Sequence, residues 1–75
     1  MEVLDKIKVV GRGYVFVVVP DQPINVGDYV FAGINAFKVT SVERLSHMKN
    51  VGLILAPNKA AGELIEVGDT ILLLT

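Results

Sequence analysis

Cysteine and tryptophan are absent from this chain of 75 residues, and histidine occurs once. Without cysteine, neither a disulfide framework nor a cysteine-based zinc site can stabilise the fold. A domain this small buries only a modest share of its surface, so its stability depends on its apolar core. His47 has no cysteine or second histidine to join it in a metal site. We therefore expect no bound metal and no cofactor.

An excess of charge of one sign is also missing. Seven Lys and Arg residues face eight Asp and Glu residues, for a formal net charge of −1, so the chain as a whole has no electrostatic attraction for nucleic acid or acidic lipid. No apolar run approaches the ~20 residues that span a bilayer, and the longest, 14–19, ends at Pro20. Four charged residues between Met1 and Lys8 argue against a signal peptide. We expect a cytoplasmic protein with no membrane contact.

Strand-forming residues dominate what is present. Val, Ile, Tyr, Phe and Thr gather in short runs separated by Gly, Pro, Asn and Asp, which is the pattern of an all-β domain. One domain, 1–75, is expected from the length. Residues 57–64 have room for one helical turn. The runs predict six strands, at 3–10, 14–19, 28–32, 37–45, 51–56 and 70–74.

In the first run, simple alternation along the strand predicts which side chains face the core. Val3, Ile7 and Val9 are expected on the inner face, and Lys6 and Lys8 on the solvated face. The aromatic residues of the chain are also expected in the core, which leaves few platforms for stacking on nucleic-acid bases. These aromatic residues are Tyr14, Phe16, Tyr29, Phe31 and Phe37.

Two other runs depart from simple alternation. The run 14–19 is apolar on both faces, so it is either central and covered on both sides or exposed to a partner. In the fourth run, the inward residues Val39 and Val42 lie three positions apart instead of two. An extra residue must be accommodated between them, which predicts a β-bulge near Thr40 and Ser41.

One pattern, I-x-V-G-D-x-[VI]-apolar, occurs twice, at 24–31 and at 65–72. In each copy we expect the Val to pack inward and the Gly to adopt a backbone angle closed to other residues. The Asp carboxylate is expected to accept hydrogen bonds from nearby backbone N–H groups. Two such turns predict a pseudo-symmetric barrel and explain both aspartates without catalysis. The structural turn residues are Gly27, Asp28, Gly68 and Asp69.

Residues able to carry chemistry are few, and we expect no enzyme. No serine lies in a G-x-S-x-G context, and the phosphate-binding pattern G-x-x-x-x-G-K-[ST] is absent. Arg12, between two glycines, is either an exposed residue of a tight turn or a contact for phosphate or carboxylate. His47 is either an exposed loop residue or a contact in a binding loop. The candidate contacts for RNA or another anion are Lys6, Lys8, Arg12, His47 and Lys49.

Five motifs, read in order, resemble the second domain of elongation factor Tu and its relatives among the translational GTPases. The resemblance implies a closed six-stranded antiparallel β-barrel of the reductase/isomerase/elongation factor common-domain type. In that family the barrel performs no catalysis, packs on the GTPase domain and contacts tRNA or small-subunit RNA. A double-psi barrel is the alternative fold, since Gly-Asp turns recur there too. The motifs are GRGYV at 11–15, INVGD at 24–28, VTSVE at 39–43, NVGLIL at 50–55 and IEVGD at 65–69.

The sequence also departs from the family pattern. The 75 residues hold no GTPase domain, and valines stand at 17–19 where the family has Thr-Gly. We therefore expect a stand-alone, non-catalytic module that binds a protein partner or itself. The alternative is an accessory protein in translation that binds RNA, the ribosome or tRNA through the basic residues. The expected partner interface comprises Val15, Val17, Val18, Val19, Leu72 and Leu74.

Overall fold

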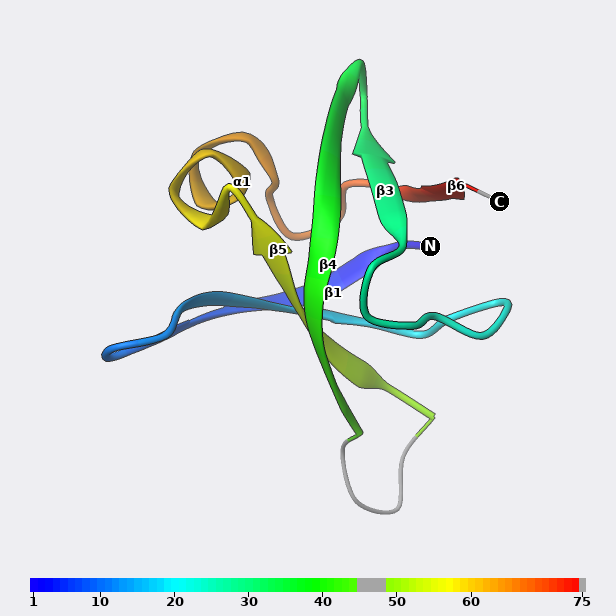
Figure 1. The fold of residues 1–75 in the computed structure, drawn as a ribbon, viewed down its shortest axis with the longest axis horizontal. Coiled ribbons are helices and arrows are strands. Elements are labelled where there is room, and N and C mark those ends of the chain that lie inside the picture. The colour runs from blue at the N-terminus through cyan, green and yellow to red at the C-terminus, as the bar shows by residue number, and fades with distance from the viewer. Residues whose placement is uncertain (45–48, 75) are drawn as a thin grey trace.

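The computed structural model describes residues 1–44 and 49–74. Six antiparallel strands form one sheet in the order β1-β2-β5-β4-β3-β6, with a short helix packed against it (Figure 1). This confirms the all-β prediction, with six strands close to the predicted ranges. The elements are β1 (Val3–Val9), β2 (Gly13–Val18), β3 (Tyr29–Ala32), β4 (Asn35–Arg44), β5 (Val51–Ala56), α1 (Asn58–Leu64) and β6 (Leu72–Leu74).

The helix α1 is seven residues long, which exceeds the single turn expected from the sequence. It follows β5 directly, and its buried residues Ala61 and Gly62 face the sheet. No helix formed by the described residues is long and apolar enough to cross a membrane.

The core lies on the inner face of the sheet, and its members among residues 1–44 and 49–74 are all apolar. Phe16, Leu53 and Leu55 are among its largest fully buried side chains. Burying a side chain of this size stabilises the fold by about 1.5–3 kcal/mol. The core cluster contains Val3, Phe16, Val18, Ile24, Val30, Phe37, Val39, Val51, Leu53, Leu55, Ala61, Ile65 and Ile71.

Two register shifts decide which side chains face the core. The pairing of β4 with β5 shifts between Val39 and Ser41, which confirms the predicted bulge. A second shift follows Val3 in the pairing of β1 with β2 and was not predicted. Because one extra residue reverses the two faces of a strand, Ile7 is exposed and Lys6 is half-buried. The prediction is therefore wrong for Ile7 and Lys6, whereas Lys8 is exposed as expected and Val9 is half-buried.

The two Gly-Asp turns have the same geometry. Gly27 and Gly68 have φ angles of +98° and +94°, in the left-handed region that favours glycine. Oδ2 of Asp28 and Oδ2 of Asp69 each accept a hydrogen bond of 2.8 Å from the backbone N–H three residues earlier. The carboxylates therefore hold the turns closed, as expected from the sequence.

The valine of each turn does not pack inward, contrary to the prediction. Val26 and Val67 are exposed, whereas Ile24 and Ile65, two positions earlier, are buried. The isoleucines enter the core before the chain turns, and the valines then lie on the solvent side of the turn.

Both turns dock on a strand in the same way. The turn glycines donate to the carbonyls of Val39 and Val3, each at 2.8 Å. In return, the N–H groups of these valines donate to the carbonyls of the turn aspartates at 2.7 and 2.8 Å. The two halves of the chain are therefore related by a pseudo-two-fold axis. Phe31 and Leu72 are equivalent in the repeat and pair with each other, so the axis passes between them.

The sheet is not closed by a continuous strand pair, so the structure shows an open sheet in place of the predicted closed barrel. Its edge strands are β1 and β6. Glu2 and Thr70 form an isolated bridge, and Met1 and Ile71 exchange backbone hydrogen bonds of 2.7 and 2.8 Å. The start of the chain is therefore held beside the segment that leads into β6, and Met1 and β6 lie on one side of the molecule (Figure 1).

Candidate protein-binding surface

Large apolar side chains gather on the outer face of β3 and β6. Side chains alternate along a strand, so the buried Val30 places its neighbours Tyr29 and Phe31 on the outside. Tyr29 pairs with Leu74, and Phe31 pairs with Leu72. Tyr29, Leu72 and Leu74 are 45%, 62% and 54% exposed, and Phe31 is half-buried. We call these four residues the β3–β6 face.

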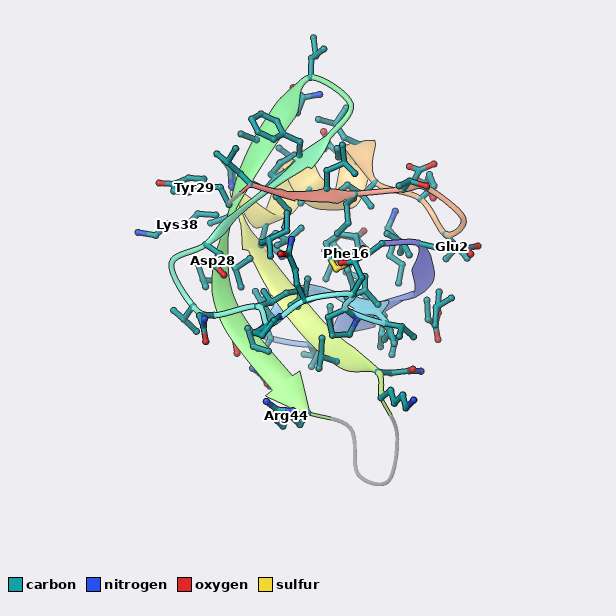
Figure 2. All side chains as sticks on the ribbon, turned by 90° about the vertical axis from the view of Figure 1, so that its right-hand side faces the viewer. Glu2, Phe16, Asp28, Tyr29, Lys38 and Arg44 are labelled. Carbon is teal, nitrogen blue, oxygen red and sulfur yellow. The ribbon has the colours of Figure 1, made fainter. Side chains whose placement is uncertain are left out.

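Charged residues flank the β3–β6 face on two sides. On β4, Lys38 pairs with Tyr29 and is exposed. At the other side, Glu2 bridges Thr70, two positions before the first residue of β6, and is also exposed. Figure 2 shows Glu2 and Lys38 on opposite sides of the molecule, with β6 between them. A contiguous apolar patch with a polar rim is typical of an interaction site.

The strand β2 does not provide the exposed face that its sequence suggested. Val15, Val17 and Val18 are buried within the chain, so their predicted role in a partner interface is wrong. Gly52 explains part of this, because a Cβ at that position would lie 2.8 Å from Cγ1 of Val15. The missing side chain lets the outer side of β2 pack closely on β5. Val19, just beyond β2, stays exposed.

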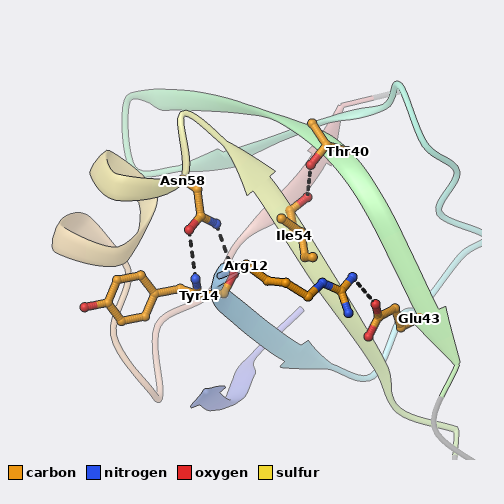
Figure 3. A network of polar contacts seen from close by, with 6 residues as sticks. All are labelled: Arg12, Tyr14, Thr40, Glu43, Ile54 and Asn58. Carbon is orange, nitrogen blue, oxygen red and sulfur yellow. Dashed lines mark hydrogen bonds and ion pairs between the residues drawn. The ribbon is translucent and has the colours of Figure 1, made fainter. Parts of the chain in front are cut away.

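Two of the predicted RNA contacts lie on different parts of the surface. Arg12, in the turn between β1 and β2, reaches past β5 to form an ion pair with Glu43 on β4 (Figure 3). The guanidinium of Arg12 is thus already paired with the carboxylate of Glu43. Lys49 is exposed at the start of the segment leading into β5. His47 lies outside the described residues.

Lys6 and Lys8 are brought together beside Tyr14. Their Nζ atoms lie 5.2 and 5.9 Å from the centre of the Tyr14 ring, within cation–π range. Nζ of Lys6 also lies 3.1 Å from Oε1 of Glu66. The hairpin therefore gathers two basic residues, but one of them is already paired.

Asn58 joins α1 to β2, a role that the sequence reading missed. Its Oδ1 accepts from the N–H of Tyr14 at 2.8 Å, and its Nδ2 donates to the carbonyls of Tyr14 and Leu55 at 3.0 and 3.1 Å (Figure 3). Two glycines allow this approach. A Cβ on Gly13 would lie 2.0 Å from Asn58 Oδ1, and a Cβ on Gly62 would lie 2.2 Å from the Tyr14 ring. The sequence contained one signal of this close packing, because Gly62 stands inside the segment that forms α1.

Tyr29 was also missed as a surface residue. The expected core position holds for Phe16 and Phe37 but is wrong for Tyr29. The repeat contained a signal, because the polar Thr70 stands in the second copy where Tyr29 stands in the first. Thr70 and Tyr29 are both exposed, so the polar residue marks the solvent-facing side of this position in the repeat.

Comparison with known proteins gave no match to a family model, a curated protein sequence or a solved structure. The likeness to the second domain of the translational GTPases stays a prediction from the five sequence motifs.

Proposed function

We propose that this chain is a non-catalytic binding module that uses the β3–β6 face to bind a protein, either a different protein or a second copy of itself. The observation that carries the proposal is the exposure of Tyr29, Leu72 and Leu74 side by side on two paired strands. Covering a half-exposed leucine contributes roughly 1 kcal/mol of binding free energy, because full burial is worth about 1.5–3 kcal/mol.

The contacts of Asp28 and Asp69 favour a structural role for these two aspartates over a catalytic one. An Oδ2 atom of Asp28 and of Asp69 accepts a backbone hydrogen bond within its own turn. These hydrogen bonds account for both carboxylates as parts of the fold.

We further propose that this open sheet is related to the barrel that the resemblance implies, that of the reductases, isomerases and elongation factors. This relationship is supported by the equivalent docking of the two Gly-Asp turns. It is also supported by the bridge between Glu2 and Thr70, which draws the start of the chain toward β6.

Binding of RNA, the ribosome or tRNA has weaker support. Arg12 and Lys6 are paired with Glu43 and Glu66. A phosphate would have to displace these carboxylates, which lowers the net gain from each contact. The apolar face needs no such rearrangement.

A pull-down with matched variants tests the proposal. The wild-type protein, the double variant Leu72→Lys/Leu74→Lys and the control Ile34→Lys are immobilised and exposed to a nuclease-treated lysate of the native host. Ile34 is 95% exposed in the turn between β3 and β4, outside the β3–β6 face. We expect a protein that the wild type and the control retain and the double variant loses. Equal retention by all three baits would refute the proposal.

A further inference from the structure

The β3–β6 face has an internal symmetry that its charges break. The pseudo-two-fold axis between Phe31 and Leu72 exchanges β3 with β6. Lys38 pairs with Tyr29, the first residue after the first Gly-Asp turn. Glu2 bridges Thr70, the first residue after the second Gly-Asp turn. The two therefore occupy equivalent positions on opposite sides of the centre, and their charges have opposite sign.

The spacing of the sheet shows how far apart these charges lie. With about 4.8 Å between strands and about 3.3 Å per residue, each lies about 10 Å from the centre of the face. The apolar side chains of Tyr29, Leu72 and Leu74 lie between them. Among residues 1–44 and 49–74, neither Glu2 nor Lys38 forms an ion pair. Both charges are therefore available to a partner that covers the face.

We propose that this partner is a second copy of the same chain, docked face to face. The two-fold axis of the pair would lie in the interface, perpendicular to the line from Glu2 to Lys38. Rotation about this axis superposes the two copies and places Glu2 of each copy opposite Lys38 of the other. Two identical ion pairs then flank one apolar centre. This inference rests on the proposed function of the face.

The charge pattern favours a second copy because an isologous interface must be complementary to itself. Like charges at the two equivalent positions would repel in this arrangement, whereas opposite charges attract at both. The apolar centre supplies most of the affinity, and the exposed ion pairs set the orientation. A face about 20 Å across is small for a stable dimer. We therefore expect a reversible dimer that dissociates on dilution.

Charge reversal combined with mixing tests this geometry by sedimentation velocity over a range of concentrations. Glu2→Lys alone and Lys38→Glu alone should each raise the dimer dissociation constant about tenfold, because like charges then meet at both ends of the interface. An equimolar mixture of the two variants should recover the dimer, since opposite charges meet again at both ends. The double reversal in one chain should recover it too. Lys59→Glu, on the exposed side of α1, is the matched control and should change nothing.

Each other outcome contradicts a specific part of the argument. A wild-type chain that stays monomeric at all concentrations overturns the dimer. If the pull-down still separates wild type from Leu72→Lys/Leu74→Lys, the face binds another protein and the proposed function stands. A dimer that ignores the charge reversals overturns the docking geometry. A dimer that survives Leu72→Lys/Leu74→Lys overturns the inference. If the pull-down also retains the same proteins with all three baits, the proposed function is overturned as well. Far-UV circular dichroism confirms that each variant is folded.

Discussion

Gly62 lies on the side of α1 that packs against β2, and a methyl group there would meet the ring of Tyr14. A Cβ on Gly62 would lie 2.2 Å from Cδ2 and 2.3 Å from Cε2 of that ring. On an exposed helix, Gly→Ala stabilises by about 1 kcal/mol, because alanine is the better helix former. The contact with Tyr14 predicts the opposite sign for Gly62→Ala.

The magnitude follows from these two opposing terms. Overpacking costs about 1–3 kcal/mol, and a contact this short with ring carbons favours the upper end. After the gain of about 1 kcal/mol in helix propensity, Gly62→Ala should lower the free energy of unfolding by about 2 kcal/mol. In a domain of this size, that corresponds to a fall in Tm of about 8–16 °C. Thermal melts followed by circular dichroism measure the shift, and urea titration measures the free energy.

The double variant Tyr14→Ala/Gly62→Ala separates the contact from the helix propensity. Without the ring, Gly62→Ala should stabilise by about 0.5–1 kcal/mol relative to Tyr14→Ala alone. The coupling energy between the two positions is then about 3 kcal/mol. An increase in Tm for Gly62→Ala in the otherwise unchanged chain would refute the packing argument.

Three further substitutions probe polar contacts, each measured by urea unfolding. Asn58→Ala removes three hydrogen bonds and leaves the backbone groups of Tyr14 without their partner, so it should destabilise by about 2–3 kcal/mol; a loss below about 0.5 kcal/mol would contradict a structural role for this amide. Asp69→Ala removes one hydrogen bond in an exposed turn and should cost about 1 kcal/mol, and an unchanged stability would count against the turn closure described above. Arg12→Ala breaks an exposed ion pair with Glu43 and should cost less than about 1 kcal/mol. A much larger loss would mean that the Arg12 side chain also contributes to packing.

The two bulges show where sequence patterns predict a fold and where they fail. The bulge in β4 was predictable because Val39 and Val42 are spaced three apart and both had to reach the core. The bulge in β1 left no such trace, since Val3 and Ile7 already fit an unbroken alternation. Its presence emerged only from the pairing with β2, which exposes Ile7 and half-buries Lys6.

The surface was predictable in part. Leu72 and Leu74 were expected at an interface and are exposed on the β3–β6 face, although binding at that face stays a prediction. Tyr29 was assigned to the core because aromatic residues are usually buried in small domains. Nothing in the sequence indicated that Glu2 and Lys38 occupy equivalent positions, because 36 positions separate them. Only the bridge of Glu2 to Thr70 and the pairing of Lys38 with Tyr29 reveal this equivalence.

The sequence by itself determined the all-β class, the approximate strand ranges and the two Gly-Asp turns. These features depend on the alternation of side chains and on turn chemistry, which act between residues a few positions apart. Only the tertiary structure decided which apolar faces are covered. Val15 and Val17 are buried on β2, which pairs with β5, and the missing side chain of Gly52 leaves room for Val15, whereas Leu72 and Leu74 are exposed because the outer side of the last strand has nothing packed over it among the described residues. Burial depends on which strands become neighbours, and that choice involves residues far apart in the chain.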